Sequence, residues 1–274
     1  MGSLENKVAF ITGAARGQGR SHAVRLAEAG VDIIAVDIAE QIPTVPYPLA
    51  TEADLAETAR LVEATGRRCV SVKADVRDLL AIAAAADHGA AELGGIDIVI
   101  ANAGILPFGL DDTLEKAAAS WGDAIGVMLT GVYNTLKATQ QHLIDRGPGG
   151  SAILISSTAG LKGTGGDSGG SMGYGAAKHG VVGLMRGYAK LLGPNGIRVN
   201  ALHPCAVATP MIINDAFAAF ATADRSTNDL SGRLLDVPMI QAEDVSAAVL
   251  WLVSDEARFV TGVSLPVDAG ATCP

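Results

Sequence analysis

The first 37 residues of the chain contain a strand, a glycine-rich turn, a helix, a second strand and an acidic residue, in that order. Residues 7–11 and 31–36 are the apolar, strand-like runs, the turn is Thr12 to Gly19, and Asp37 follows the second run. Glycine lets a backbone approach a pyrophosphate closely, and a helix N-terminus attracts its charge. Glycine turns also occur in plain loops and caps. With a strand before it and an acid after it, this turn predicts a βαβ unit that binds a dinucleotide.

The residue that ends the second strand discriminates between two nicotinamide cofactors. The carboxylate of Asp37 would accept hydrogen bonds from a free ribose 2′-hydroxyl and repel a 2′-phosphate. Arg16 is the opposing signal, because its guanidinium could pair with that phosphate, although it could equally be a solvated loop residue. No basic residue follows Asp37 before Arg60. We therefore expect NAD.

Strand-like and helix-like segments alternate along the remaining chain. Further strands are expected at 69–72, 96–100, 152–155, 197–202 and 263–267, and helices from about 52, at 76–93, 114–145, 173–192 and 243–253. This alternation predicts one α/β domain over residues 1–274, a Rossmann-type, doubly wound parallel sheet of seven strands with helices on both faces. Pro266 lacks an N–H, which favours an edge position for the last strand. We expect residues 1–150 to bind the cofactor and residues 151–274 to carry catalysis and substrate binding.

The composition excludes several classes of function. Hydrophobic residues make up 49% and charged residues 18% of the chain, which favours a compact domain over disorder. A formal net charge of −9 argues against nucleic acid or an anionic membrane as a partner. The three cysteines have no metal-ligand spacing, and no apolar run is long enough for a signal peptide or a membrane span. We expect a cytoplasmic protein without a metal.

Two segments of unusual composition flank the expected site. Residues 38–50 contain Pro43, Pro46 and Pro48, which predicts a stiff, non-helical connection, either a plain surface loop or a flap over the cofactor. Residues 163–173 are rich in glycine, which predicts a mobile loop at the mouth of the site and a helix that begins only near Gly173.

Tyr174 and Lys178 are four residues apart, so on a helix they lie on the same face. A phenol with a reference pKa of about 10 is a poor base at neutral pH unless a positive charge stabilises its phenolate, and Lys178 would supply that charge. Ser157 ends an apolar strand and would aim its hydroxyl at the same substrate oxygen. The alternative is that Tyr174 and Lys178 are an ordinary exposed pair on a helix.

Taken together, these pieces resemble the short-chain dehydrogenase/reductase family. They occur in the family's order along nearly the whole chain. The matching pieces are Thr12-Gly13-(x)3-Gly17-x-Gly19, Asn102-Ala103-Gly104, Ser157, Tyr174-x-x-x-Lys178 and the turn from Pro204 to Pro210. The proline-rich insertion around Tyr47, the run Gly13 to Arg20 and Lys178-His179-Gly180 resemble a mycofactocin-associated, carveol dehydrogenase-like subgroup. Members of that subgroup are thought to hold NAD tightly and to pass electrons to a redox peptide cofactor.

The resemblance implies roles for individual residues. Tyr174 would be the general acid/base, Lys178 would lower its pKa and bind the nicotinamide ribose, and Ser157 would orient the substrate oxygen. The implied cofactor-binding residues are Gly13, Arg16, Gly17, Gln18, Gly19, Asp37, Ile38, Asp75, Val76, Asn102, Ala103, Gly104, Tyr174, Lys178, Pro204, Val207 and Thr209. His203 is given no role.

Two positions depart from the family's pattern. Met128 occupies the place of an asparagine that helps to hold a proton-relaying water beside the lysine, and a thioether cannot donate a hydrogen bond. Asn134 lies six residues further on and would point elsewhere. Cys205 stands where the family usually has glycine, and its side chain would crowd the nicotinamide end or tighten the turn.

The sequence thus predicts an NAD-dependent oxidoreductase that interconverts a secondary alcohol, apolar and cyclic, and its ketone. The alternatives are an NADPH-dependent 3-oxoacyl reductase, which Asp37 disfavours, and a catalytically idle NAD-binding protein, which Met128 alone supports. The family further implies a homotetramer, and the subgroup implies mycofactocin as an external redox carrier.

Overall fold

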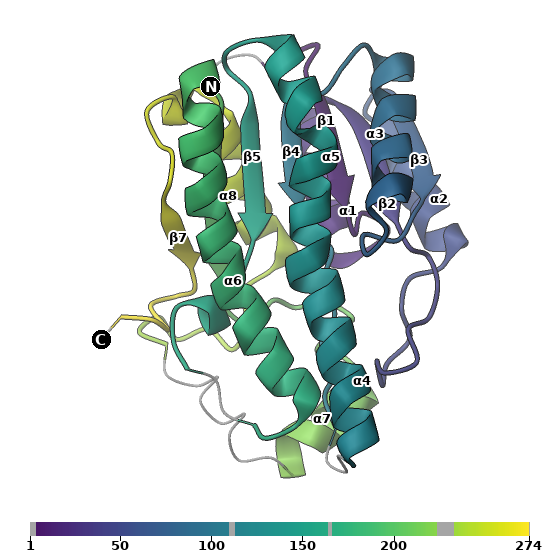
Figure 1. Cartoon of the computed structure of the whole chain (residues 1–274), viewed down its shortest axis with the longest axis vertical. Coiled ribbons are helices and arrows are strands. Elements are labelled where there is room, and N and C mark those ends of the chain that lie inside the picture. The colour runs from purple at the N-terminus through teal and green to yellow at the C-terminus, as the bar shows by residue number, and fades with distance from the viewer. Residues whose placement is uncertain (1–3, 110–112, 164–165, 224–232, 274) are drawn as a thin grey trace.

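Seven parallel strands form one twisted sheet in the computed structural model, which describes residues 4–109, 113–163, 166–223 and 233–273 (Figure 1). The strand order is β3-β2-β1-β4-β5-β6-β7. The strands are β1 (Val8–Thr12), β2 (Asp32–Asp37), β3 (Cys69–Lys73), β4 (Ile98–Ala101), β5 (Ser151–Ile155), β6 (Arg198–Pro204) and β7 (Ser264–Val267). The last strand is at the edge, as Pro266 predicts.

Helices cover both faces of this sheet. They are α1 (Gly17–Glu28), α2 (Glu52–Glu63), α3 (Leu79–Leu93), α4 (Leu114–Ile125), α5 (Gly131–Arg146), α6 (Gly169–Leu192), α7 (Asp215–Ala223) and α8 (Ala242–Val253). Helices α3, α5 and α6 lie in front of the sheet in Figure 1, and α1 and α8 lie behind it. The predicted fold class is confirmed. No helix of the described residues is long and apolar enough to cross a membrane.

The central strands β1, β4 and β5 have apolar residues at consecutive positions because both of their faces are buried. In β1, Val8 and Phe10 pack in the core beneath α3 to α6, whereas Ala9 and Ile11 pack in the core beneath α1 and α8. All four are at most 2% exposed. A strand placed between two helical layers therefore needs apolar residues on consecutive positions, and the sequence supplies them.

The functional edge of the sheet follows from the strand order. β1 lies between β2 and β4, so β2 and β3 extend the sheet on one side of β1 and the later strands extend it on the other side. Ligands bind at this switch point, beyond the carboxyl ends of the strands. Those ends point toward the lower half of Figure 1, where α7 lies. Gly13 follows β1 and Asn102 follows β4 at this edge.

Several predicted boundaries are wrong for local reasons. The helix expected from Val76 begins at Leu79, because the side chain of Asp78 caps it by accepting hydrogen bonds from the N–H groups of Leu80 and Ala81. The long helix expected to be interrupted by Gly126 and Gly131 instead continues through a π-helical segment, Gly126–Thr130. The helix expected near Gly173 begins four residues earlier.

His22 is a buried titratable group between the helices behind the sheet. It is 0% exposed, and its Nδ1 lies 2.8 Å from the Ser246 hydroxyl of α8. Its Nε2 has no hydrogen-bond partner among the described residues. Burial lowers the pKa of His22 from 6.5 to about 3, because the charged imidazolium would lose its hydration.

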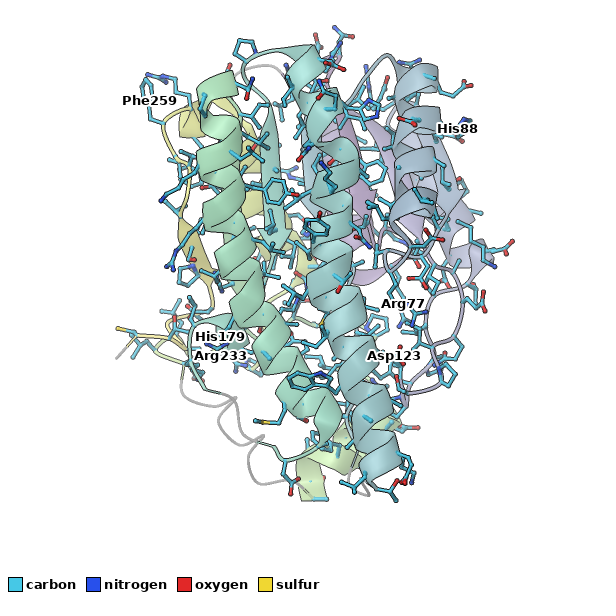
Figure 2. All side chains as sticks on the ribbon, viewed as in Figure 1. Arg77, His88, Asp123, His179, Arg233 and Phe259 are labelled. Carbon is cyan, nitrogen blue, oxygen red and sulfur yellow. The ribbon has the colours of Figure 1, made fainter. Side chains whose placement is uncertain are left out.

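We predict that His22 makes the fold sensitive to acid. Below pH 6.5 the unfolded chain takes up a proton that the folded chain binds only near pH 3, so stability falls as the pH falls. The loss between pH 7 and pH 4 is about 3 kcal/mol from this group. Urea unfolding at both pH values measures it. His22→Asn should lose less stability over this interval, whereas His88→Asn, which removes an exposed histidine (Figure 2), should follow the unsubstituted protein. Equal losses in His22→Asn and the unsubstituted protein would contradict this assignment.

Candidate active site

The glycine turn after β1 is packed too closely for a side chain at Gly13 or at Gly19. Gly13 has a φ of +68°, and a Cβ there would lie 2.7 Å from the Cα of Ala103. A Cβ on Gly19 would lie 2.0 Å from the carbonyl oxygen of Gly13. The Asn102 Nδ2 donates hydrogen bonds to the carbonyls of Thr12 and Gly13 at 3.0 and 3.1 Å. Asn102 thus fastens the end of β4 to the turn, and the α1 N-terminus remains accessible.

A first cavity lies over this turn, and most of the predicted cofactor residues line it. They are Gly13, Arg16, Gly17, Gln18, Gly19, Asp37, Ile38, Asp75, Val76, Asn102, Ala103, Gly104 and Thr209. The Asp37 carboxylate accepts hydrogen bonds from the N–H groups of Ala15 and Ala39, both at 3.0 Å. These bonds hold the carboxylate at the end of β2, where it could accept a hydrogen bond from a ribose hydroxyl. A bare glycine cradle with a carboxylate at its far end fits NAD.

The proline-rich insertion, residues 38–50, forms one wall of the first cavity through Ile42, Tyr47 and Leu49. It contains no helix, as its prolines predict. The Gln41 side chain holds the insertion together: its Nε2 donates to the carbonyls of Ile42, Val45 and Tyr47, and its Oε1 accepts from the Leu49 N–H. Of the two expectations, the structure favours a flap over a plain surface loop.

The flap is fastened to the rest of the fold at two places. The Tyr47 hydroxyl accepts a hydrogen bond from the Leu106 N–H at 3.0 Å, and its ring stacks on Phe108. The Thr44 hydroxyl donates to Asp123 on α4 at 2.7 Å. Asp123 also pairs with Arg77 at 2.7 Å, and the two side chains are labelled in Figure 2.

Ser157, Tyr174 and Lys178 are brought together where β5 meets α6. Lys178 is 4% exposed, and its Nζ donates a 2.8 Å hydrogen bond to the carbonyl of Ile155. The same Nζ lies 5.6 Å from the centre of the Tyr174 ring. The Ser157 hydroxyl forms a hydrogen bond with Tyr174 and accepts one from the Ala159 N–H. Tyr174 is therefore half-buried and Lys178 is buried, so the alternative of an exposed pair is wrong.

The pKa values of this group differ from the sequence-based expectation. Burial raises the pKa of Tyr174, and the hydrogen bond from Ser157 only partly opposes that effect. Burial also lowers the pKa of Lys178 to about 8, since an ammonium inside the protein loses its hydration. The charge of Lys178 thus does not offset the effect of desolvation on the pKa of Tyr174, contrary to the prediction from the sequence.

His203 is a residue of this site that the sequence analysis missed. It is 0% exposed at the end of β6, and its Nδ1 donates a 2.8 Å hydrogen bond to the carbonyl of Ser157. Burial lowers its pKa, so the ring is neutral and holds the Ser157 backbone as a hydrogen-bond donor. No sequence pattern distinguishes such a histidine from a core histidine, because the contact joins β6 to the end of β5.

A second cavity adjoins the first and has an apolar wall. Ser157 and Tyr174 line it together with Leu106, Phe217 and Phe220. Met211, Thr209 and Gln18 line both cavities, which therefore meet. Pro204, Cys205 and Val207 line the second cavity and not the first. Three predicted cofactor residues, Tyr174, Pro204 and Val207, thus line the second cavity and not the first, and Lys178 lines neither.

Met128 lies in the π-helical segment and is fully buried. A Cβ on Gly104 would lie 3.8 Å from the Lys178 Nζ and 3.9 Å from the Met128 Cγ, so both side chains border Gly104. The Asn134 Nδ2 donates to the carbonyls of Val76 and Arg77 and does not face Lys178. Asn134 is therefore no substitute for the missing asparagine, as expected.

Glycines in the first turns of α6 serve close packing. A Cβ on Gly170 would lie 1.5 Å from the Pro107 carbonyl oxygen, and one on Gly169 would lie 2.1 Å from that of Ala117. The Ser168 side chain caps the helix by accepting a hydrogen bond from the Ser171 N–H. The segment expected to be a loop up to Gly173 is thus helical from Gly169; residues 164–165 lie outside the described residues.

We predict that Gly170→Ala disrupts the placement of Tyr174. Overpacking of this size costs about 1–3 kcal/mol of unfolding free energy, because α6 must move away from Pro107. Gly183 on the same helix has no heavy atom within 4 Å of its Cβ position, so Gly183→Ala should stabilise the protein by about 0.5–1 kcal/mol. Chemical denaturation of both variants measures the difference. Equal stabilities would show that the close contact has no energetic weight.

Comparison with known proteins agrees with this geometry. A family model described as enoyl-(acyl carrier protein) reductase matches residues 13–272. The (−)-trans-carveol dehydrogenase of Rhodococcus erythropolis is 45% identical over 282 residues, covering 99% of this chain and 99% of that protein. The chain belongs to the short-chain dehydrogenase/reductase family. It is an oxidoreductase, as the sequence predicts.

Two solved members of the family are similar over their whole length. A carveol dehydrogenase from Mycobacterium avium in complex with NAD is 47% identical, with a TM-score of 0.92 and 100% of each chain covered. A short-chain dehydrogenase from Mycobacterium paratuberculosis bound to NAD is 44% identical, with a TM-score of 0.90 and 99% of each chain covered. Both complexes agree with the prediction of NAD from Asp37.

Proposed function

We propose that the protein interconverts an apolar, cyclic secondary alcohol and its ketone with NAD as the cofactor. One observation carries the proposal: the Ser157 and Tyr174 hydroxyls lie together on the wall of an apolar cavity that opens into the glycine-lined one. A carbinol held at these hydroxyls would lie beside the nicotinamide end of the first cavity. The carveol dehydrogenases among the relatives support a substrate of this class.

Three side chains divide the chemistry in this proposal. Ser157 orients the substrate oxygen, and Tyr174 exchanges a proton with it. Lys178 would bind the nicotinamide ribose. Bound NAD would supply the hydride acceptor. Because burial raises the pKa of Tyr174, the phenol is the dominant form near neutral pH, and alcohol oxidation becomes faster as the pH rises.

Tyr174→Phe should abolish turnover in either direction, because it removes the proton donor and leaves the ring packing in place. General acid–base catalysis contributes about 10²- to 10⁴-fold, so a loss of at least two orders of magnitude in kcat is expected. NAD binding, measured by calorimetry, should remain. Tyr188→Phe is the matched control, since Tyr188 is a buried tyrosine further along the same helix. Activity in Tyr174→Phe equal to that of the control would overturn the mechanism.

We further propose that NAD is retained between turnovers and reoxidised by an external carrier of the mycofactocin type. The flap supports this proposal, because Tyr47 and Thr44 fasten it to Leu106 and to Asp123 of α4. A cofactor enclosed by a flap whose middle is hydrogen-bonded to the rest of the fold would leave slowly. Electrons would then leave through a partner and not with the free cofactor.

The absorbance of the purified protein mixed with cyclic secondary alcohols, without added NAD, tests retention. A rise in reduced nicotinamide that stops after one turnover is expected. Continued turnover on adding NAD alone would contradict retention. No rise even with added NAD would favour the idle NAD-binding alternative, in which Met128 has silenced the proton relay. Met128→Asn would restore turnover in that case.

We propose a homotetramer in the cytoplasm. Exposed aromatic side chains at two places support the tetramer: Trp121 and Tyr133 lie on α4 and α5, and Trp251 and Phe259 lie on α8 and just beyond it. Phe259 is labelled in Figure 2. Two distinct self-complementary surfaces are what a D₂ tetramer uses. Light scattering of the purified protein should give the mass of a tetramer. The mass of a monomer or a dimer would contradict the proposal.

A further inference from the structure

The lining of the second cavity includes two cationic side chains. Lys162 and Arg233 line the cavity, and no aspartate or glutamate is among the described residues that line it. This is unusual for a chain whose formal net charge is −9. A neutral, purely apolar substrate would gain nothing from two cations, whose hydration is costly to remove.

The fold brings these two cations to the same wall. Lys162 follows Ser157 closely in sequence, and its Nζ donates a 3.5 Å hydrogen bond to the carbonyl of Ala271. The N–H groups of Leu234 and Leu235 both donate to the carbonyl of Ala269 at 3.0 Å, which fixes the segment after Arg233 against the C-terminal segment. Lys162 and Arg233 thus both approach residues 269–271. Figure 2 shows Arg233 on the side of the molecule where Figure 1 marks the C-terminus.

Arg233 has donors that the described residues leave unused. Its Nη1 donates to the carbonyl of Val237 at 3.1 Å. Its Nε is buried without a hydrogen-bond partner, and no carboxylate pairs with the guanidinium among the described residues. A half-buried guanidinium in a cavity is a receptor for a planar anion, because its fork donates two parallel hydrogen bonds to a carboxylate.

We propose that the physiological substrate is a hydroxy acid: a cyclic secondary alcohol that carries a carboxylate on the far side of its ring. The carbinol binds at Ser157 and Tyr174, the ring lies against the phenylalanines of α7, and the carboxylate binds at Arg233 and Lys162. Only the carbinol is oxidised, and the carboxylate is unchanged. This inference rests on the proposed function, keeps its cyclic secondary alcohol and adds a carboxylate to the otherwise apolar ring.

The test compares an acid with its neutral counterpart. The kcat/KM for 4-hydroxycyclohexanecarboxylate and for its methyl ester is measured with NAD and an artificial electron acceptor. The acid should be preferred by about 10-fold or more, as expected for hydrogen bonds to a charged group. Arg233→Gln should reduce this preference by about 10-fold, mainly through KM, and Lys162→Gln should reduce it less. A preference of less than twofold, or one that survives in both variants, would overturn the inference.

Lys190→Gln is the matched control for the loss of a positive charge, because Lys190 is exposed near the end of α6 remote from Ser157. It should keep the full preference for the acid. If Lys190→Gln lowers the preference as much as Arg233→Gln does, the effect is one of net charge, and the carboxylate site is wrong. Circular dichroism of each variant checks that the fold is retained.

A binding measurement separates this inference from the proposed function. Cyclohexanecarboxylate has no hydroxyl to oxidise, so its binding to the NAD-loaded protein, measured by calorimetry, depends only on the anion site. It should bind at least about 10-fold more tightly than its methyl ester, and Arg233→Gln should abolish the difference. Such binding without turnover of any alcohol would support the anion site and contradict the proposed function. Turnover of the neutral ester without acid-selective binding would support the proposed function and contradict the anion site.

Discussion

Lys178 connects the helix that carries the site to the strand on which the site is built. Its Nζ donates to the carbonyl of Ile155, and its own carbonyl accepts a hydrogen bond from the Ser156 hydroxyl, both at 2.8 Å. These two bonds fix α6 against the end of β5. Ser157 follows Ser156 directly, and Tyr174 lies one turn before Lys178. The two hydrogen bonds therefore set the distance between the hydroxyls of Ser157 and Tyr174.

The burial that positions this group also determines its protonation. Excluding water raises the pKa of Tyr174 and lowers the pKa of Lys178 to about 8, so each residue is pushed toward its neutral form. A neutral phenol suits proton donation to a ketone, and a phenolate suits alcohol oxidation. In the proposed reaction the same residues would therefore serve either direction.

The two cavities differ in construction. The first is walled by backbone and by the flap, and its polar contacts are held by Asn102, Asp37 and Gln41. The second is lined by residues that follow β5, by residues of α6 and α7, and by the turn after β6. Backbone-built cavities vary little with sequence, whereas a cavity built of side chains changes with each substitution. The cofactor could therefore be predicted from sequence motifs. The substrate can be inferred only from the residues that line the second cavity.

The sequence by itself determined the fold class, the family and the residues at the carboxyl edge of the sheet. Local chemistry suffices there, because glycines after β1, an acid after β2 and a tyrosine–lysine pair one turn apart are each constrained by their neighbours in sequence. The tertiary structure decided what depends on distant contacts. Gly169 and Gly170, which suggested a mobile loop, are required for packing on Ala117 and Pro107. His203 holds Ser157 from 46 residues further along the chain. Arg233 reaches the second cavity in a segment that is fixed by Leu234 and Leu235 to the carbonyl of Ala269, and no local pattern encodes either contact.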